Sequence, residues 1–544
     1  MSQARVTFLP ENRSIVVELG TTIAQAAQDA GMALTAPCAG AGTCGRCRVL
    51  LADVGSVLAC QHRIHEDLTV EIPATSRPGS LAVHLTSTIE EAENCRALDP
   101  LKTSRSEGIA RPLGLALDIG TSTIACELVD LNTGQVLVCA GRANSQAAFG
   151  AEVTRRIEHV EDHRSGDHRS KNHGSDDLAD AIIADITALV SEMAKVCEEE
   201  ALSLDAVTVA GNTAMVHFLY RYDPSGIRRP PYMPLVSAPP VVRSSALDID
   251  LPGDPLLYAL PSIGGWVGGD ITAGILATGL HRDKRLTMMI DIGTNGEIVL
   301  GNNEWLIACA ASAGPAFEGC GISCGSTATP GAIDRLFVEG DGTIRWHTIE
   351  DASPHGLCGS GLISAIAQLF RAGFIDRAGQ ILAPDTDLDE PGIVLVPASQ
   401  SGSGRPIAIL QRDIDSVILA KAALFAGTQS LLAAADLSAD DLDRLIICGG
   451  FGSVLDVEDA VTLGLIPDIA RDKISFAGNT ALRGARIALL SQDAWAEAID
   501  IAGKTGCIEL IDDADYFERF TSAQFLPHTN LGLFPSATPT EGRA

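Results

Sequence analysis

The sequence has few aromatic residues, few basic residues and no long uninterrupted apolar run. Aromatic residues make up 4% of its 544 positions, which disfavours a ligand pocket lined by aromatic rings. Lysine and arginine number 39 against 69 aspartates and glutamates, a formal net charge of −30. Such an acidic surface repels phosphate backbones and anionic lipids, so we expect neither nucleic acid nor a membrane surface as a partner.

The sequence also shows no apolar run typical of a membrane-spanning or secretory segment. No stretch approaches the roughly 18 apolar residues of a membrane span, and the chain does not begin with a basic start followed by an apolar run. We therefore expect a cytoplasmic protein with no membrane span. In a reducing compartment, the 14 cysteines indicate metal binding or buried thiols rather than disulfides.

Glycine, by contrast, is abundant, with 53 residues. The 46% of apolar and 20% of charged residues are typical of a folded globular chain. At about 100–200 residues per domain, this length predicts three or four domains. Glycine-rich turns joined by small apolar strands favour loops that bind phosphate groups.

The first 75 residues form a distinct module. They carry five basic and seven acidic side chains, so about −28 of the charge lies beyond them. We expect one helix, capped by Thr21 or Thr22, and three strands: the helix at residues 22–30 and the strands at residues 5–9, 14–19 and 68–72.

Four cysteines of this module have the spacing of an iron–sulfur site: Cys38, Cys44, Cys47 and Cys60. The glycines and alanines between the first three let backbone N–H groups approach inorganic sulfide. A zinc knuckle more often pairs two CxxC-like units, and Cys38 and Cys60 belong to none. We therefore interpret the four as ligands of a [2Fe–2S] cluster. The motif resembles plant-type and adrenodoxin-type ferredoxins, although only 12 residues separate Cys47 from Cys60.

From residue 113 onward the sequence contains an internal repeat. Leu115-Ala-Leu-Asp-Ile-Gly-Thr121 corresponds to Met288-Met-Ile-Asp-Ile-Gly-Thr294, 173 residues later. Each copy predicts a strand, a tight Gly-Thr turn and a second strand. Towards its end, each copy also predicts a long helix followed by a strand. The helices are expected at residues 176–200 and 414–435, and the strands at residues 206–210 and 444–448. Two α/β halves of like topology that face each other imply a cleft between them.

The repeated turns carry residues suited to phosphate and metal binding. In each, a strand delivers an aspartate, Asp118 or Asp291, that can orient Mg²⁺, while backbone N–H and hydroxyl groups of the turn can cradle phosphates. A third glycine turn, Gly449-Gly450-Phe451-Gly452, follows a buried strand. One such hairpin can be purely structural, but the three together are a specific set.

This set resembles the superfamily of acetate and sugar kinases, heat-shock chaperones and actin, over residues 113–510. The resemblance implies ATP and Mg²⁺ as ligands and Asp118 and Asp291 as catalytic residues. It also implies two phosphate hairpins and an adenosine loop, formed by Gly120, Thr121, Ser122 and Thr123, by Gly293, Thr294 and Asn295, and by Gly449, Gly450 and Gly452.

The predicted fold is an α+β ferredoxin-like (β-grasp) [2Fe–2S] domain followed by a duplicated α/β actin-like (ribonuclease H-like) ATPase domain. The predicted division is a [2Fe–2S] domain, a linker with a polar helix at residues 85–98, two ATPase subdomains and a tail, at residues 1–75, 76–111, 112–285, 286–513 and 514–544.

Three further motifs complete a resemblance to the reductive activators of corrinoid proteins: Asn144-Ser-Gln146 with Phe149-Gly-Ala-Glu-Val153 and Arg156-Ile157, Gly211-Asn-Thr-Ala-Met215, and Ala313-Gly-Pro-Ala-Phe-Glu-Gly319. In that family the cluster gives one electron to an inactive Co(II) corrinoid on a methyl-transfer protein, which restores Co(I), and ATP makes the uphill step possible. The resemblance implies two partners, the corrinoid protein of a methyltransferase system and a low-potential electron donor. It is compatible with a homodimer.

Two other functions fit parts of the sequence. One is ATP-dependent activation of another low-potential enzyme, such as a radical dehydratase. The known activators of that type carry a cluster between subunits of the kinase-like domain, which the N-terminal module does not resemble. The other is a small-molecule kinase with a regulatory iron–sulfur domain, which would phosphorylate an acid or a sugar without needing the cluster.

Polar residues near the second hairpin and one lysine have open roles. Residues 310–321 follow the second hairpin directly, so Ser312 and Glu318 are candidates for approaching cobalt, and a purely structural loop fits equally well. Lys421 either contacts nucleotide or extends from its helix to solvent, and we favour the latter.

A histidine-rich segment and four scattered cysteines also invite a metal assignment. Residues 159–175 are polar and aperiodic, which favours a solvated loop over a metal site. The spacing of the cysteines fits no standard metal framework, so we expect burial of all four: Cys309, Cys320, Cys324 and Cys358.

Overall fold

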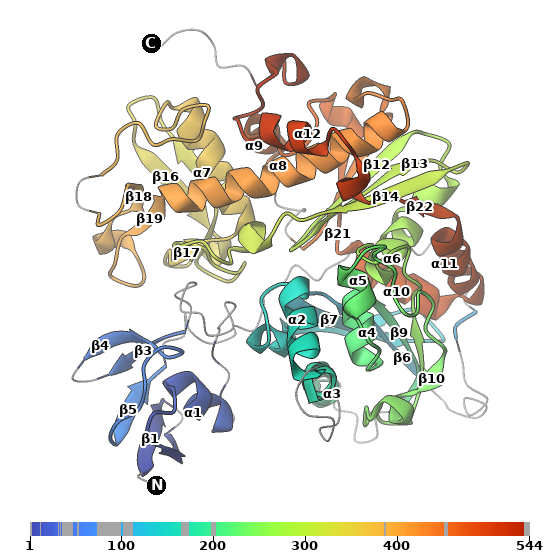
Figure 1. Ribbon diagram of the computed structural model, residues 1–544, viewed down its shortest axis with the longest axis horizontal. Coiled ribbons are helices and arrows are strands. Elements are labelled where there is room, and N and C mark those ends of the chain that lie inside the picture. Colours follow the sequence, from blue (N-terminus) through green and yellow to red (C-terminus); the bar gives the residue numbers. More distant parts are fainter. Residues whose placement is uncertain are drawn as a thin grey trace.

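Figure 1 shows the computed structural model, in which an N-terminal unit precedes two larger α/β halves. One sheet of five strands forms the N-terminal unit, and a sheet of six strands forms the centre of each half. The structure describes residues 3–10, 12–30, 32, 34, 47–51, 54–72, 99–101, 112–164, 173–196, 203–385, 388–450 and 455–537. The helix expected at residues 85–98 lies outside these described residues.

The N-terminal unit packs one helix, α1 (Ile23–Asp29), on its sheet. The predicted helix and its cap are confirmed, because the Thr22 hydroxyl accepts a hydrogen bond from the Gln25 N–H at 3.2 Å. The strand order is β2 (Arg13–Glu18), β1 (Gln3–Leu9), β5 (Leu68–Glu71), β3 (Arg48–Leu51) and β4 (Gly55–Leu58). The sequence predicts β1, β2 and β5, whereas the four-residue strands β3 and β4 are too short to give a periodic signal.

The sheet of the first half is centred on β6. This strand is buried along nearly its whole length, as its apolar run predicts for a strand covered on both faces. It pairs antiparallel with β7 and parallel with β9. The strand order is β10 (Val242–Arg243), β11 (Leu256–Ala259), β9 (Leu204–Gly211), β6 (Leu113–Ile119), β7 (Thr123–Asp130) and β8 (Val136–Ala143). Its helices are α2 (Val153–Arg164), α3 (His173–Val196), α4 (Thr213–Leu219), α5 (Ser225–Arg228) and α6 (Gly269–Thr278).

The sheet of the second half repeats this topology. Its central strand β12 pairs antiparallel with β13 and parallel with β20, as β6 does with β7 and β9. The strand order is β21 (Ile474–Gly478), β20 (Arg444–Cys448), β12 (Thr287–Ile292), β13 (Gly296–Gly301), β14 (Leu306–Ala311) and β22 (Thr505–Cys507). The duplication that the sequence predicts is therefore confirmed, with β6–β7 equivalent to β12–β13.

The second half also carries two small sheets and most of the remaining helices. One small sheet is β16 (Ile344–Thr348), β15 (Ala332–Val338) and β17 (Gly356–Leu357), and the other is β18 (Gly392–Val396) and β19 (Ile407–Leu410). The helices are α7 (Gly359–Arg371), α8 (Gln411–Ala434), α9 (Val457–Leu463), α10 (Thr480–Leu490), α11 (Gln492–Lys504) and α12 (Tyr516–Ser522).

Helix α8 is long and apolar enough to cross a membrane by length and composition alone. It is a core helix, however, since 78% of its most apolar window is buried inside the protein. Lys421 of this helix is fully buried, and its Nζ donates to the carbonyl oxygens of Phe525 and Pro527 at 2.6 and 2.7 Å. The expectation that Lys421 extends to solvent is therefore wrong, because two backbone carbonyls inside the protein replace water around the amine.

The histidine-rich segment is helical at both of its described ends. His159 lies in α2, packs against Phe149 with ring centroids 4.9 Å apart and ring planes tilted by 45°, and places Nε2 3.3 Å from the Asp177 carboxylate. The prediction of a loop from residue 159 is therefore wrong for these residues, because contacts with other segments stabilise the helix despite its polar sequence.

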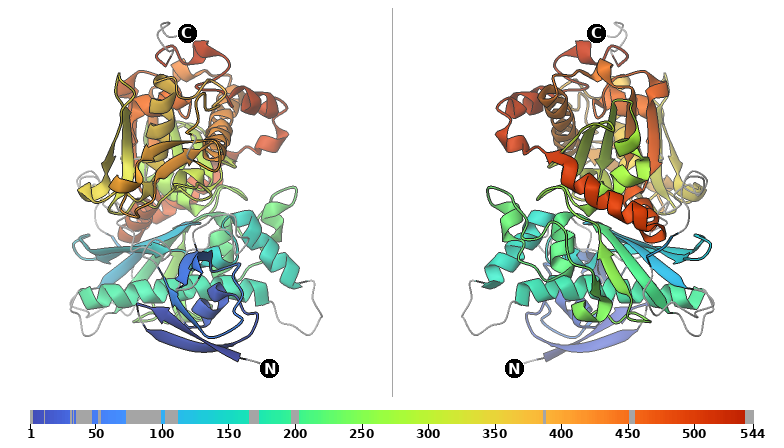
Figure 2. Two further views of the ribbon diagram at one scale, coloured as in Figure 1. Left: turned by 90° about the vertical axis from the view of Figure 1, so that its left-hand side faces the viewer. Right: turned by 90° about the vertical axis from the view of Figure 1, so that its right-hand side faces the viewer.

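The two halves share a core at their boundary. Helix α6 of the first half crosses α10, which comes from the sequence of the second half, and a Cβ on Gly484 would lie 2.1 Å from the Ala273 carbonyl oxygen. The side views show C-terminal helices, coloured orange to red, reaching the boundary between the halves (Figure 2). Glycine at position 484 therefore permits the close crossing of the two helices.

Candidate functional site

The two predicted phosphate hairpins lie opposite each other at the boundary of the halves. In the first, the Gly120 N–H donates to the Thr123 carbonyl oxygen at 2.9 Å, and in the second the Gly293 N–H donates to the Asn295 carbonyl oxygen at 3.0 Å. A Cβ at position 120 would lie 2.7 Å from the Thr123 oxygen, so the first turn requires glycine. Thr121 and Ser122 occupy the tip of the first hairpin, between β6 and β7.

The hairpins are in direct contact through their hydroxyl groups. Ser122 Oγ lies 3.2 Å from Thr294 Oγ1. Both hydroxyls donate to Oε2 of Glu318, at 2.9 Å for Thr294. Glu318 ends the 3₁₀ turn η5 (Pro315–Glu318), so the loop after the second hairpin folds back between the two hairpins. Burial raises the pKa of Glu318, while the hydrogen bonds from Ser122 and Thr294 oppose that rise.

Four carboxyl groups converge behind the hairpins: Asp118 on β6, Asp270 in the first turn of α6, Asp291 on β12 and Glu297 on β13. Burial raises the pKa of Asp118 to about 6, opposed by a hydrogen bond from Asn479. Burial, then the neighbouring Asp270 and Asp118, raises the pKa of Asp291 to about 7. Burial and Asp118 raise the pKa of Asp270 to about 7. Glu297 lies directly opposite Asp291 in the sheet, and burial raises its pKa well above the usual range.

This carboxyl set fits a hydrated Mg²⁺ ion. Mg²⁺ prefers oxygen ligands and keeps several waters, binding through one or two carboxylates together with nucleotide phosphates. Among the described residues, no three acidic, histidine or cysteine side chains converge closely enough to hold a metal ion by themselves. A cation beside Asp118 and Asp291 would remove the mutual repulsion that raises the pKa of Asp291.

The first hairpin rests on a buried arginine. The guanidinium of Arg156 is fully buried and donates to the carbonyl oxygens of Thr121 and Gly150, at 2.6 and 2.9 Å, and to the Gln146 amide oxygen at 3.0 Å. The amide of Asn144 donates to the Gly120 carbonyl oxygen at 2.9 Å. The sequence motif that contains these residues therefore supports the backbone of the first hairpin from below.

The third glycine turn begins at the end of β20, beside Asp291. Gly449 has φ +106°, and a Cβ there would lie 2.5 Å from the Ile292 carbonyl oxygen and 3.2 Å from Asp291 Oδ1. Both the left-handed backbone and the close approach require glycine. Gly450 follows with open space around its Cβ position, while Gly452 lies outside the described residues.

Asn479 was not singled out from the sequence, yet it joins the second half to the first. Its Nδ2 donates to Asp118 Oδ2 at 2.8 Å, and its Oδ1 caps α10 by accepting from the Leu482 N–H at 2.8 Å. Asp270 and Glu297 were missed as well. The sequence signal for Asn479 is the tripeptide Gly-Asn-Thr, which precedes α10 as it precedes α4, and the signal for Asp270 is a Gly-Gly-Asp run that begins α6.

Two of the four predicted cluster ligands lie in the described part of the N-terminal unit. Cys47 is buried and Cys60 is half-buried, and the Ala59 N–H donates to the Cys47 carbonyl oxygen at 2.8 Å. The chain segments that carry them are therefore neighbours, as two ligands of one cluster require. Cys38 and Cys44 lie outside the described residues.

The remaining candidate residues differ in their burial. Ser312 is exposed on the loop that leads to Glu318. Three of the four scattered cysteines, Cys309, Cys324 and Cys358, are buried as expected, and Cys320 is half-buried. No disulfide joins any of the described cysteines.

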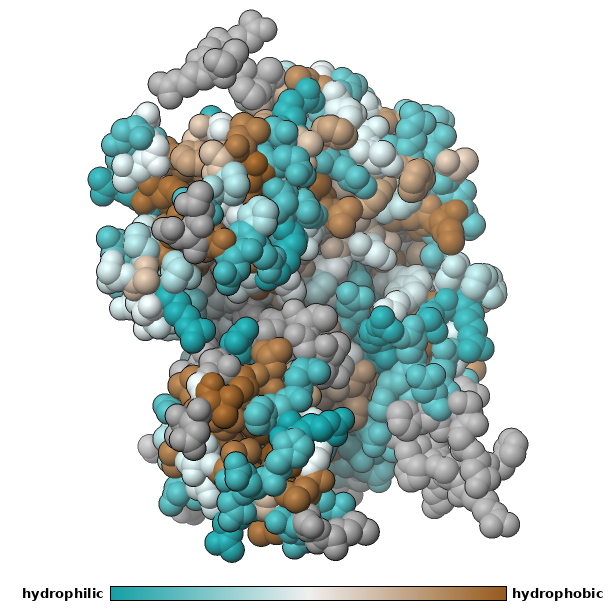
Figure 3. Space-filling model, turned by 60° about the vertical axis from the view of Figure 1, so that its left-hand side comes forward, coloured by the Kyte–Doolittle hydropathy of each residue, from teal (hydrophilic) through white to brown (hydrophobic). Residues whose placement is uncertain are grey.

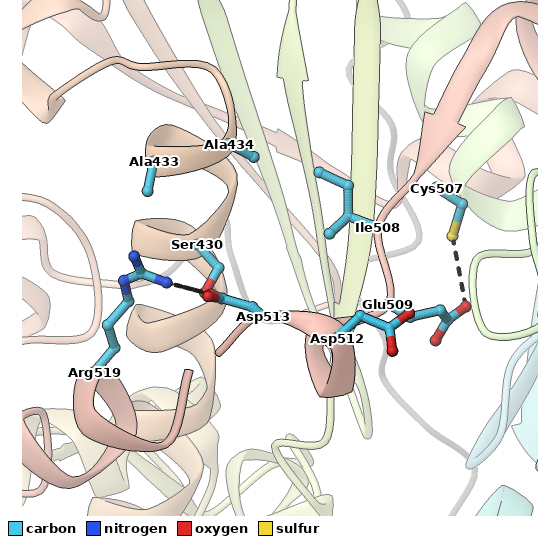
Figure 4. A pocket seen from close by; sticks show the side chains of 9 residues that line it. All are labelled: Ser430, Ala433, Ala434, Cys507, Ile508, Glu509, Asp512, Asp513 and Arg519. Atoms are coloured by element: carbon cyan, nitrogen blue, oxygen red, sulfur yellow. Dashed lines mark hydrogen bonds and ion pairs between the residues drawn. The ribbon is translucent and has the colours of Figure 1, made fainter. Parts of the chain in front are cut away.

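A pocket of about 500 Å³ lies between the C-terminal end of α8 and the segment after β22 (Figure 4). Two of its charged side chains pair with each other, since Asp513 accepts from Arg519 and also from Ser430, at 2.5 Å for Ser430. No described residue of the three glycine turns lines this pocket, so we do not assign nucleotide binding to it.

Three family models match successive parts of the chain. Residues 6–65 match a "2Fe-2S iron-sulfur cluster binding domain", residues 113–283 the "RACo middle region" and residues 285–538 the "C-terminal domain of RACo the ASKHA domain". The solved structure of a "reductive activator for corrinoid, iron-sulfur protein" is 36% identical, covers 98% of this chain and 100% of its own, and superposes with a TM-score of 0.75.

Two curated proteins are also similar. The chain is 31% identical to the "corrinoid activation enzyme RamQ" of Eubacterium limosum over 441 residues, 78% of this chain and 72% of the relative. It is 29% identical to a "[Co(II) methylated amine-specific corrinoid protein] reductase" of Methanosarcina barkeri over 49% of each chain. The ferredoxin-type unit, the actin-like ATPase fold and the predicted resemblance are thereby confirmed.

Proposed function

Because the chain belongs to the family of reductive activators of corrinoid proteins, we propose that it uses Mg-ATP to drive the one-electron reduction of an inactive Co(II) corrinoid on a partner protein. The observation that carries this proposal is the joint presence, on one chain, of a ferredoxin-type unit and two opposed phosphate hairpins. The bound [2Fe–2S] cluster supplies the single electron, and the cobalt of the partner is the substrate.

Each site residue has a proposed role. Cys38, Cys44, Cys47 and Cys60 hold the cluster. Asp118 and Asp291, assisted by Asp270, orient Mg²⁺ and its waters, in line with the convergence of their carboxyl groups. The backbone N–H and hydroxyl groups of the two hairpins hold the phosphates, and the turn at Gly449, Gly450 and Gly452 accommodates the adenosine.

The reduction is energetically uphill, and binding energy can offset the difference. Plant-type clusters lie near about −400 mV, and Co(II) is harder still to reduce. Preferential binding of the weakly coordinated cobalt geometry that favours reduction raises the Co(II)/Co(I) potential by ~59 mV for each ~1.4 kcal/mol of preference. We propose that the activator binds its partner in such a state, and that ATP binding or hydrolysis then changes the cleft and releases the partner.

We further propose that the partner belongs to a methyltransferase system, that a low-potential electron donor reduces the cluster, and that the protein acts in the cytoplasm, where its thiols stay reduced. In the lower part of Figure 3, brown apolar patches lie among teal polar residues on the N-terminal unit. The exposed large apolar side chains among its described residues are Val16, Leu19, Leu50 and Val54. This surface suits a transient donor contact. We also propose that the protein forms a homodimer. Analytical ultracentrifugation would measure the mass of the assembly and so test this.

The decisive experiment mixes the full-length protein with a Co(II) corrinoid protein of a methyltransferase system, a chemical reductant and Mg-ATP. The expected result is the absorbance spectrum of Co(I), absent when ATP is omitted. The absence of Co(I) with any corrinoid protein, together with phosphorylation of an added acid or sugar, would contradict the proposal and favour a kinase.

A further inference from the structure

Three residues of the predicted linker are docked on the ATPase domain. The Leu101 N–H donates to the Leu489 carbonyl oxygen at 2.9 Å, and the Asp99 N–H donates to the Leu490 carbonyl oxygen at 3.2 Å. The Gln492 N–H donates back to the Asp99 carbonyl oxygen at 2.9 Å. Leu101 is 5% exposed and belongs to the core shared by the two halves. The segment at residues 99–101, which follows the iron–sulfur domain in sequence, is therefore held at the junction of α10 and α11.

The other end of α10 lies at the nucleotide cleft. Its cap residue Asn479 donates to Asp118, one of the carboxyl groups behind the first hairpin. The helix has 11 residues, so it spans about 16 Å between these two ends. One rigid element thus contacts the proposed Mg²⁺ site at its first turn and the linker at its last.

Buried contacts along its length pack α10 against the first half. The Thr208 hydroxyl donates to the Ala485 carbonyl oxygen at 2.8 Å, and Arg486 forms a buried ion pair with Glu127 at 3.3 Å. A helix packed in this way shifts by sliding as a whole against its neighbours rather than by bending. A displacement at Asn479 would therefore be carried to Leu489 and Leu490.

We propose that α10 couples the nucleotide cleft to the linker of the iron–sulfur domain, with Asn479 as the positioning residue that responds to Mg-nucleotide. The carboxylate of Asp118 accepts the Asn479 amide in this structure. A Mg²⁺ ion and its waters at Asp118 compete for that oxygen and repel the N–H donor, so Asn479 loses its partner. Helix α10 then shifts, and residues 99–101 loosen. The coupling rests on the proposed function only in requiring that Mg-ATP binds in the cleft.

Hydrogen exchange on the full-length protein tests the coupling without a corrinoid partner. We expect the Asp99 and Leu101 amides to exchange on the order of tenfold faster when Mg²⁺ and a non-hydrolysable ATP analogue saturate the cleft, within the usual range of coupling between sites. Asn479→Ser keeps an oxygen that can cap α10 but cannot reach Asp118. In this variant the two amides should exchange fast without the analogue, and the analogue should add nothing. Unchanged exchange in the wild type, with binding verified by calorimetry, would overturn the proposal.

Linkage provides a second, independent readout that does not depend on Asn479→Ser folding. If Mg-nucleotide loosens the docked segment, then weakening that segment must tighten nucleotide binding by up to the same factor. Leu101→Ala should therefore lower the Kd for the Mg-bound analogue several-fold, whereas Ile499→Ala, which removes an exposed side chain from α11, should not change it. An unchanged Kd in Leu101→Ala would overturn the coupling and leave the proposed function intact. Failure of the wild type to bind the analogue would overturn both.

Discussion

Ser122 Oγ lies 3.2 Å from Thr294 Oγ1, although the two residues belong to different halves of the molecule. Both hydroxyls also donate to Glu318. No phosphate group fits between two oxygen atoms at this separation, so in the proposed binding mode the nucleotide phosphates must displace these contacts. Glu318 bridges the two hairpins in this structure, and we expect it to oppose the entry of phosphates between them.

Replacing Glu318 with glutamine tests this role. Gln keeps an oxygen that accepts from Ser122 and Thr294 but removes the negative charge that opposes incoming phosphates. We expect Glu318→Gln to lower the Kd for Mg-ATP several-fold at pH 8, measured by calorimetry. Ser312→Ala, an exposed change in the same loop, is the control. Weaker binding in Glu318→Gln would instead identify Glu318 as a ligand of the bound Mg-nucleotide.

The raised pKa of Asp291, about 7, makes the stability of the nucleotide-free protein depend on pH. The folded state binds more protons than the unfolded state between pH ~4 and ~7, so this contribution to the free energy of unfolding is complete below that range and is lost as the pH rises through about 7. Asn does not titrate, so Asp291→Asn should raise the melting temperature most at pH 8, less at pH 5 and little near pH 4. Each pKa unit corresponds to about 1.4 kcal/mol.

The same variant should lose Mg-ATP hydrolysis and the stabilisation that Mg-ATP gives the wild type, while the visible spectrum of the cluster stays unchanged. Asp250→Asn, an exposed change in the first half, is the matched control. Normal turnover by Asp291→Asn would contradict the assignment of the cleft. An equal melting temperature for the variant and the wild type at pH 8 would show that Asp291 is not held in an unfavourable charged state.

The sequence predicts those parts of the site that are local in the chain. Each hairpin places its aspartate, glycine and hydroxyl residues within a few positions of one another. The repeated motif that contains Asp118 and Asp291 can therefore be recognised from the sequence alone. Asp270 and Asn479 join the same site from distant helices, and their contribution depends on the crossing of α6 and α10. No periodicity or spacing in a single sequence encodes that crossing.

Two predictions fail for related reasons. The sequence predicts that Lys421 extends to solvent because lysine is costly to bury, but the carbonyl oxygens of Phe525 and Pro527, about a hundred positions away, accept hydrogen bonds from its amine. The sequence predicts a loop at His159 because its neighbours are polar, but contacts with Phe149 and Asp177 stabilise the helix. In both cases a distant partner overrides the local preference.

The cluster assignment predicts a clean separation of redox and nucleotide chemistry. Cys60→Ser should abolish the visible absorbance of the [2Fe–2S] cluster and the formation of Co(I), because serine replaces one thiolate ligand. Mg-ATP binding should remain, since the hairpins lie in another part of the chain. Cys38→Ser, Cys44→Ser and Cys47→Ser should behave alike, and Cys139→Ser, at an exposed position on β8, should leave the spectrum unchanged. An unchanged spectrum in Cys60→Ser would refute the ligand assignment.

The fully buried Arg156 predicts that the first hairpin depends on guanidinium geometry and not on positive charge alone. Its nitrogens reach Thr121, Gly150 and Gln146 in different directions, which the single amine of a lysine cannot do. Arg156→Lys should therefore destabilise the protein by about 3 kcal/mol and weaken Mg-ATP binding at least tenfold, measured by denaturant unfolding and calorimetry. The neighbouring Arg155→Lys, whose side chain is 72% exposed and pairs with Glu158, should alter neither. Full nucleotide affinity in Arg156→Lys would show that the hairpin backbone holds its shape without this support.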